Sequence, residues 1–486
     1  MPVLGKRDKV ANALATTGAS VNVSNAAAPT ELGQVPRIKS LSPLGIEWSY
    51  ALPEGWVSVA DYGAVGDGVT NNDAAVADAY ATGKNVYWPC GTYLSPKAYL
   101  LSATIIPLPG QKTLFPSHYW SGQYEWADSA AWDAAVTYAS HTYWTGYILF
   151  TGTTNYLFDQ KYSASVVEGA FVVQHPSYTP TAGGHFRLGN STTLSLSHEY
   201  IRCYSLGAWD AFTGYGKTLR SRIFQCDADT HRNAAFLVNI ASPFGDIRWD
   251  SLRVKSINEA GYGGFDGAVG LYVRQADTGK ITNLSIKDCI KQIWLAGDTG
   301  TIDQFTITNL DLENSVLASD FAIIGDGAYA VNNTTISGLK AFRATRGNLK
   351  LGSNAKDTNI TDALLRGAVY VDGGTGNKLA NSHIHNRGSL LAGTCATMNG
   401  TGGALLEVNM DDATTGVQNN GQRTRVIGGA SNNLASGIKW ASGANGATVV
   451  GHDASTCTTP MDTSAAGAPA AKATGRGTAN LGVADW

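Results

Sequence analysis

Three carboxylates near the middle of the chain have the types and spacing that acid–base chemistry requires. Asp227 and Asp229 are two residues apart in CDADTHR, with Ala228 between them, so a strand would place both side chains on one face. Glu259 follows in INEAGYGGFD. Cleavage of a glycosidic bond needs one carboxylic acid to protonate the leaving oxygen and a second carboxylate as base or nucleophile, and repulsion between neighbouring carboxylates helps to keep one of them protonated. We therefore interpret these three residues as candidate catalytic groups.

The distance between these carboxylates depends on how successive strands align. If Ile223 aligns with Leu252, Asp229 lies beside Asn258, and Glu259 lies one residue further along. Neighbouring strands are about 4.8 Å apart. Long side chains could then span the retaining separation of about 5 Å or the inverting one of about 6.5–9.5 Å, so the stereochemistry stays open. Other acidic residues of the same span are reserve candidates: Glu199, Asp250 and Asp266.

An adjacent pair, His231 and Arg232, indicates an alternative chemistry. On a polymer of uronic acids, Arg232 could neutralise the substrate carboxylate while His231 or Tyr204 removes the C5 proton. That reaction is a β-elimination, so a lyase is the alternative to a hydrolase. Aspartates are also frequent turn residues, and a single histidine is often structural.

Aromatic residues are concentrated upstream of this span. Residues 115–150 contain 11 aromatic residues in 36 positions, against 9% in the whole chain. Flat rings with polar edges suit sugar rings, although a packed insertion or a subunit contact would also use them. The candidate sugar-binding residues are Trp120, Tyr124, Trp126, Trp144, Tyr204 and Trp209.

The elements that must position these groups are short strands that recur every 21 to 32 residues. The centres are Ile201, Ile223, Leu252, Leu284, Phe305, Ile336 and Ile360. A second series follows in phase and includes AFLVN, GAVGLYV, KQIWLAG and SDFAIIG. Gly, Asn and Asp separate the strands, and no amphipathic helix of useful length lies between them. This pattern predicts an all-β solenoid, a parallel β-helix.

An exposed end of such a solenoid has to be capped. Residues 71–81, NNDAAVADAYA, predict a short helix with Asn71 or Asn72 as N-cap and Asp73 in the first turn. The apolar side chains expected to cover the end of the solenoid are Val76, Ala79 and Tyr80.

The segment around this helix carries a family resemblance. Residues 59–94, with DYGAVGDGVTNNDAAVADAY followed by VYWPCGTYL, resemble the N-terminal signature of the pectate-lyase-like β-helix superfamily, which includes phage tailspikes and polygalacturonases. The resemblance implies a right-handed parallel β-helix that acts on polysaccharide. No NxD, DD and GHG pattern occurs in consecutive coils, which speaks against pectin hydrolysis.

Among these relatives a phage tailspike fits best. No signal peptide is visible at the N-terminus, as in a virion protein released by lysis. The resemblance then implies a homotrimeric virion tail protein that attaches to other tail proteins through its N-terminus and depolymerises a bacterial capsule or O-antigen. A non-catalytic receptor-binding spike is the second reading, and a secreted or cellular pectin-type enzyme is the third.

We expect five regions along the chain. They are a virion-attachment or neck segment (1–50), the N-terminal cap and first coil (51–97), an aromatic-rich insertion (98–165), the β-helix (166–461) and an extended tail (462–486).

The composition of the chain limits the kinds of molecule that it is expected to bind. The net charge is −3 with no basic block, so nucleic acid is not expected, and no run reaches the ~18 apolar residues of a spanning helix, so membrane insertion is not expected. The six cysteines show no CxxC spacing and are expected to be reduced. His383 and His385 form an HxH pair for which no third ligand is evident, so neither a metal nor another cofactor is expected.

Overall fold

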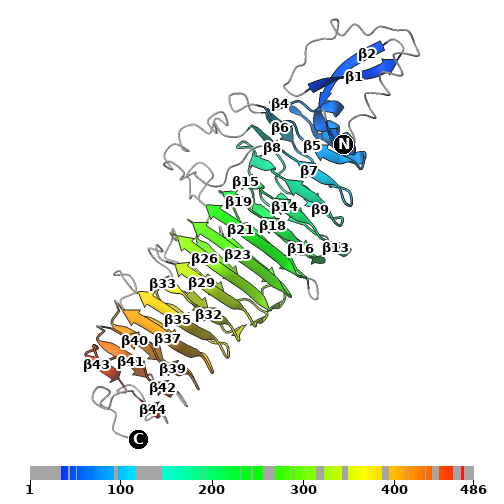
Figure 1. Ribbon diagram of the computed structural model, residues 1–486. Coiled ribbons are helices and arrows are strands. Elements are labelled where there is room, and N and C mark those ends of the chain that lie inside the picture. The colour runs from blue at the N-terminus through cyan, green and yellow to red at the C-terminus, as the bar shows by residue number, and fades with distance from the viewer. Residues whose placement is uncertain are drawn as a thin grey trace, which may run out of the picture.

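The computed structural model describes residues 34–41, 44–50, 52–91, 97–116, 145–189, 191–229, 231–241, 245–255, 269–287, 289–313, 322–341, 349–385, 393–411, 413–432, 434–440, 448–462 and 472–474. From residue 52 onward they form one elongated stack of coils, and the backbone of each coil pairs in parallel with the coils before and after it (Figure 1). The predicted all-β parallel β-helix is confirmed.

Two long sheets run the length of the stack. The 13-stranded sheet contains β9 (Tyr156–Gln160), β12 (Gly184–Leu188), β16 (Asp210–Gly216), β20 (Ala234–Ile240), β22 (Val269–Gln275), β24 (Lys291–Leu295), β27 (Ala322–Ile324), β30 (Leu349–Leu351), β34 (Val369–Val371), β36 (Thr394–Met398), β38 (Thr415–Asn419), β41 (Ser436–Trp440) and β43 (Thr459–Asp462).

The 24-stranded sheet is bent into two arms. It contains β3 (Trp56–Ser58), β4 (Asp67–Asn71), β5 (Asn85–Tyr87), β6 (Lys97–Leu101), β7 (Lys112–Leu114), β8 (Gly146–Phe150), β10 (Val166–Glu168), β11 (Phe171–Gln174), β14 (Glu199–Ile201), β15 (Tyr204–Leu206), β18 (Arg222–Phe224), β19 (Asp227–Asp229), β21 (Ile247–Lys255), β23 (Gly279–Lys287), β26 (Phe305–Glu313), β29 (Thr335–Ala341), β32 (Asn359–Thr361), β33 (Leu364–Arg366), β35 (Lys378–His385), β37 (Ala404–Asp411), β39 (Arg425–Ile427), β40 (Ala430–Ser431), β42 (Thr448–Val450) and β44 (Lys472–Thr474).

Shorter strands complete the coils. They are β13 (Ser195–Leu196) with β17 (Thr218–Leu219), and β25 (Ile302–Asp303) with β28 (Val331–Asn332) and β31 (Ala355–Lys356). Each regular coil passes through the first arm of the 24-stranded sheet, the bend, the second arm, the 13-stranded sheet and one of these short strands or bridges.

The bend between the two arms is built from residues in the left-handed backbone conformation. Asn283 and Asn309 have φ values of 53° and 54°, a conformation that asparagine tolerates better than most residues. Their side chains form a ladder, since Asn309 Nδ2 donates to Asn283 Oδ1 at 3.0 Å and Asn283 Nδ2 donates to Asp250 Oδ1 at 2.8 Å. The bend therefore repeats from coil to coil and keeps the two arms at a constant angle.

The interior of the stack is apolar and partly aromatic. Residues that are register partners on successive strands form what we call a register row. Four phenylalanines of the 13-stranded sheet occupy one such row, and their rings stack face to face: Phe158, Phe186, Phe212 and Phe236. All four are fully buried. Five of the six cysteines are also buried and all six are free, as the sequence predicted.

The predicted cap is confirmed. Helix α2 (Asp73–Ala81) follows the N-cap residue Asn72, and its buried residues are Val76, Ala79 and Tyr80. The Asn72 side chain caps no helical N–H. It binds the backbone of Val65 instead, which fixes the turn that leads into the helix. The short 3-10 helix η2 (Val59–Tyr62) precedes that turn.

Two expected regions differ from the structure. Within 98–165, β7 and β8 pair in parallel with β10 and β11 of the region that follows, so this part of the chain supplies coils of the solenoid. Only 117–144, which contains most of the aromatic residues, lies outside the described residues. In the tail, β44 pairs with β42 and continues the sheet.

Within residues 1–50, β1 (Gln34–Leu41) and β2 (Leu44–Tyr50) form an antiparallel hairpin. Among the described residues no helix combines the length and the apolar character needed to cross a membrane.

The phenylalanine row should dominate the stability of the central coils. Phe212→Ala removes a fully buried ring stacked between two others, and we expect a loss of about 3–5 kcal/mol of unfolding free energy. The same substitution at Phe224, which is half-buried on the outer side, is the matched control and should cost less than half as much. Chemical denaturation of the two variants checks this, and equal losses would contradict the stacked core.

Candidate functional site

An acidic residue begins strand β16 of the 13-stranded sheet and lies on the outer face. Asp210 is the register partner of Ala234 and, through it, of Val269. Its Oδ1 accepts a hydrogen bond from Asn233 Nδ2 at 2.7 Å, and Tyr156 Oη lies 3.4 Å from its Oδ2. The side chain is 5% exposed.

The Tyr156 contact crosses an intervening coil. Tyr156 begins β9 and Asp210 begins β16, with Gly184 of β12 between them in the same row. A Cβ on Gly184 would lie 1.8 Å from the Asp210 carbonyl oxygen, so only glycine fits here. Because Gly184 has no side chain, none from this row position lies between Tyr156 and Asp210.

Burial gives this carboxyl group an unusual proton affinity. Desolvation raises the pKa of Asp210 from 3.8 to about 7, although the hydrogen bond from Asn233 and the charge of Arg274 act in the opposite direction. A carboxyl group that holds a proton near neutral pH can donate it to a leaving group, so Asp210 has the property of a general acid.

Next to Tyr156 lies a buried ion pair. The Arg187 guanidinium is 4.7 Å from the centre of the Tyr156 ring and donates to Asp159 through Nε at 2.8 Å and through Nη2. Asp159 is almost completely buried, so its charge is compensated by Arg187 and Lys161. This pair packs against the ring that reaches Asp210.

Further along the same face, two aromatic rings stack. Tyr272 and Trp294 are in register on β22 and β24, with ring centres 4.5 Å apart and planes 4° apart. Both rings donate to carboxylates, Tyr272 to Asp298 at 2.6 Å and Trp294 to Asp326 at 2.7 Å. The Lys291 ammonium lies 3.5 Å from the centre of the Trp294 ring.

Arg274 connects the two parts of this face. Its Nε lies 3.1 and 3.2 Å from the two oxygens of Asp298, and its charge acts on both Asp298 and Asp210. The apolar contacts of Tyr272 also extend to Ala234, the register partner of Asp210. We call this group the acid–aromatic patch, defined as Tyr156, Asp210, Asn233, Tyr272, Arg274, Trp294 and Asp298.

The predicted catalytic carboxylates lie on another face. Ile223 aligns with Trp249 and not with Leu252, so the expected register was wrong by three residues. Asp229 therefore lies beside Lys255 rather than Asn258. The error arises because the left-handed bend at Ser251 breaks the alternation, and both Trp249 and Leu252 point into the core.

Asp227 and Asp229 nevertheless share the outer face of the second arm, as predicted, since Ala228 between them belongs to the core. Asp227 is paired with Arg253, with contacts of 2.7 and 3.1 Å, and lines a groove of about 500 Å³ that continues past Ser285. Asp229 Oδ2 accepts a hydrogen bond from Tyr204 Oη at 3.2 Å. The structure thus gives both carboxylates a nearby donor.

Two of the reserve residues, Glu199 and Asp250, are not brought together with Asp227. Glu199 begins the first arm, five residues before Tyr204, the register partner of Asp227. Asp250 belongs to the bend ladder. Burial would raise its pKa, but the hydrogen bonds from Thr282 and Asn283 outweigh burial and lower it.

Glu259 and Asp266 lie outside the described residues, in the connection between β21 and β22. That connection enters β22 at Val269, two coils from Asp210 in the same row.

The side chains of three histidines are buried in the interior, and burial keeps them neutral. Burial lowers the pKa of His185 to about 3 and the pKa values of His198 and His231 to about 4. His231 is 1% exposed, and its Nε2 lies 2.9 Å from the Val269 carbonyl oxygen, so it holds the start of β22 in place. This placement argues against His231 as the base of a lyase. Arg232 lies half-buried at the same corner.

Of the predicted sugar-binding residues, four lie outside the described residues: Trp120, Tyr124, Trp126 and Trp144. Tyr204 is 3% exposed and packs in an apolar cluster with Phe171 and Leu206, which leaves little ring surface for a sugar. Trp209 is half-buried and immediately precedes Asp210.

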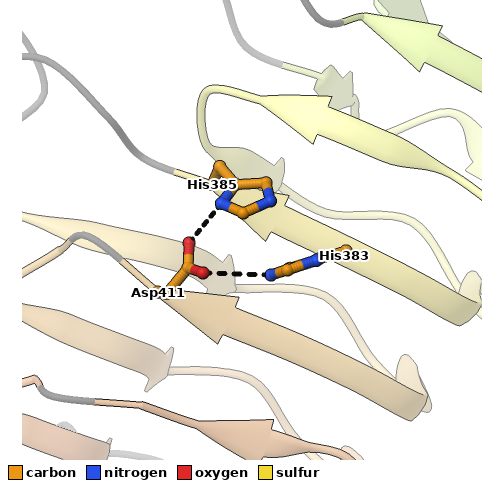
Figure 2. Close-up of side chains that lie close together, drawn as sticks. All are labelled: His383, His385 and Asp411. Carbon is orange, nitrogen blue, oxygen red and sulfur yellow. Dashed lines mark hydrogen bonds and ion pairs between the residues drawn. The ribbon is translucent and has the colours of Figure 1, made fainter.

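The HxH pair has a neighbouring acid that the sequence did not reveal. Asp411 of β37 is the register partner of His385 on β35, and it contacts both His383 and His385 (Figure 2).

Sequence reasoning missed the acid–aromatic patch, although one signal was present. Tyr272 and Trp294 each lie three residues after the first residue of their strands, in GAVGLYV and KQIWLAG. Equal offsets in consecutive coils predict stacking. Nothing in the sequence marks Asp210, because its properties come from Tyr156 and Asn233 on other coils.

Comparisons with known proteins bear on the fold. Residues 56–107 match the family described as rhamnogalacturonase A/epimerase, pectate lyase-like. No curated protein matches the chain in sequence.

Several solved structures are similar in shape. A tailspike double mutant of Escherichia coli bacteriophage HK620 in complex with pentasaccharide is 10% identical, with 91% of this chain and 82% of that chain covered and a TM-score of 0.52. The tailspike protein 3 of bacteriophage CBA120 is 11% identical, covering 99% and 70%, with a TM-score of 0.45. The A-module of an Azotobacter vinelandii mannuronan C-5 epimerase is 14% identical, covering 86% and 100%, with a TM-score of 0.40. The chain has the pectate-lyase-like right-handed β-helix fold, and the neighbours of that fold include tailspikes and mannuronan epimerases.

The raised pKa of Asp210 predicts a pH-dependent stability. Between about pH 4 and pH 7 the folded chain holds a proton that the unfolded chain releases, so stability falls as the pH rises, by about 1.4 kcal/mol per pH unit, and levels off above pH 7. Asp210→Asn keeps the Asn233 hydrogen bond and cannot titrate. Chemical denaturation of both proteins at several pH values should show the variant gaining stability relative to wild type over this window, whereas parallel curves would contradict the buried, protonated carboxyl group.

Proposed function

We propose that this protein is a phage tailspike that binds a bacterial surface polysaccharide, a capsule or O-antigen, and depolymerises it by glycosidic hydrolysis. The observation that carries the proposal is the acid–aromatic patch. It places a carboxyl group with a pKa of about 7 on the same face as a stacked tyrosine–tryptophan pair. The fold supports it, because β-helices of this kind include polysaccharide-active enzymes.

In this mechanism Asp210 donates its proton to the leaving glycosidic oxygen. Asn233 and Tyr156 hold the carboxyl group in place, and burial keeps it protonated until the substrate arrives. Trp294, which is half-buried, provides the apolar surface against which a sugar ring packs, and the buried Tyr272 ring stacks against it and supports it.

Charges of both signs surround the stack. The Lys291 ammonium lies 3.5 Å from the centre of the Trp294 ring, and the Arg274 guanidinium lies 5.7 Å from the centre of the Tyr272 ring. Asp298 and Asp326 accept hydrogen bonds from the two rings, and Asp298 is paired with Arg274. Acidic and neutral polysaccharides are therefore both candidate substrates.

Hydrolysis also needs a second carboxylate, which either attacks the sugar as a nucleophile or activates the attacking water as a base. Asp298, paired with Arg274, belongs to the patch, and Glu259 and Asp266 lie in the connection that enters β22 two coils from Asp210. Asp227 and Asp229, on the second arm of the other sheet, remain the alternative catalytic pair. Substituting each of these carboxylates in turn would identify the one that acts with Asp210.

Hydrolysis is favoured over β-elimination by the state of the candidate bases. His231 is buried and bound to a backbone carbonyl oxygen. The other candidate base, Tyr204, is 3% exposed and its hydroxyl group donates a hydrogen bond to Asp229.

The assembly is part of the proposal. We infer a homotrimer in the virion tail, attached to other tail proteins through the N-terminal segment, and we expect no nucleic-acid partner and no membrane insertion. Light scattering coupled to size-exclusion chromatography measures the trimer.

The activity test compares Asp210→Asn with wild type on a panel of acidic and neutral capsular and O-antigen polysaccharides. New reducing ends report cleavage, and ultraviolet absorbance of an unsaturated product reports elimination. We expect wild type to release reducing ends without that absorbance, and the variant to be at least ~100-fold slower. Because protonated Asp210 is required, wild-type activity should decline as the pH rises above about 7.

Asp227→Asn is the control on the other sheet. It should retain activity within a few-fold, with thermal unfolding as a check of folding. If Asp210→Asn keeps full activity and Asp227→Asn loses it, the active site lies on the second arm instead. If wild type binds a polysaccharide but never cleaves it, the protein is a receptor-binding spike and not a hydrolase. If the product is unsaturated, the protein is a lyase.

A further inference from the structure

A compact group of metal-ligand side chains lies near the C-terminal end of the solenoid, on the outer face of the second arm (Figure 2). His383 and His385 flank Ile384, which points into the core, so both imidazoles project outward from β35. Asp411, the last residue of β37, projects from the next coil. The register of the two strands thus fixes three potential ligands at one place.

The distances within this group are those of a metal site. His383 Nε2 lies 3.1 Å from Asp411 Oδ2, and His385 Nδ1 lies 2.6 Å from Asp411 Oδ1. One ligand atom from each residue lies within 4.8 Å of the others. Nitrogen and oxygen ligands about 2.0–2.2 Å from a tetrahedral zinc ion are separated by about 3.3–3.6 Å. Small side-chain rotations would therefore bring all three onto one ion.

The contact between His385 and Asp411 supports this interpretation. Asp411 Oδ1 is buried and, among the described residues, accepts no properly aligned hydrogen bond, although His385 Nδ1 is so close. The two imidazole rings are also crowded, with centres 3.8 Å apart. Two imidazoles and a carboxylate held this close together form a donor set for a cation.

We propose that His383, His385 and Asp411 bind one divalent transition-metal ion of the zinc class. Two imidazole nitrogens and one carboxylate oxygen match zinc, cobalt or nickel, and they do not match magnesium or calcium, which require mostly oxygen ligands. The ligands come from β35 and β37, so the ion joins successive coils. All three side chains are about one-quarter to one-third exposed, which leaves a path for the ion and a position for water.

The test uses the full-length protein after removal of metals with a chelator and dialysis. Zn²⁺ is titrated by calorimetry, and bound metal is counted by mass spectrometry of the dialysed protein. We expect one high-affinity Zn²⁺ per chain and a higher Tm in its presence, because the ion binds only the folded coil pair. Mg²⁺ should give neither effect.

Two variants locate the site. His385→Gln and Asp411→Asn should each weaken Zn²⁺ binding at least ~10-fold while keeping the apo-protein folded. His175→Gln removes an imidazole from the loop that follows β11 and is the matched control, so it should bind as wild type does. The proposal is overturned if wild type binds no Zn²⁺ at micromolar concentration, if the two site variants bind it unchanged, or if the control loses binding equally.

Discussion

Parallel backbone pairing between successive coils is the constraint on which the rest of the structure depends. It keeps each register row continuous, so that Ile223, Trp249 and Ile281 fall on one inward line and Phe186, Phe212 and Phe236 on another. A residue added to or removed from one coil strand would turn its side chains from the core to the solvent. Variation in length is therefore confined to the connections, and the strands carry the fixed positions.

The same constraint explains how residues far apart in sequence form the acid–aromatic patch. Asp210 receives its neighbours from coils before and after its own, namely Tyr156, Asn233 and Arg274. Its proton affinity comes from burial at the start of its strand, which a side chain can tolerate only when its hydrogen bonds are satisfied. Gly184 is essential to the arrangement because any side chain there would collide with the Asp210 backbone.

The fold was predictable from the sequence and the site only in part. The spacing of short strands and the helix at 73–81 depend on local pattern, which the sequence carries directly. The register between coils does not, because Trp249 and Leu252 are both inward and equally apolar. Because of that ambiguity, the predicted register partner of Asp229 was wrong by three positions. The third potential ligand beside His383 and His385 could not be predicted either, because it depends on the pairing of β35 with β37.

The central claim is that the outer face of the 13-stranded sheet holds the polysaccharide. The most direct measurement is a crystal structure of the Asp210→Asn protein with an oligosaccharide from a polysaccharide that wild type binds. The account predicts a sugar ring against Trp294 with a glycosidic oxygen beside residue 210. An oligosaccharide seated instead in the groove along Asp227 and Arg253, with the acid–aromatic patch empty, would contradict it.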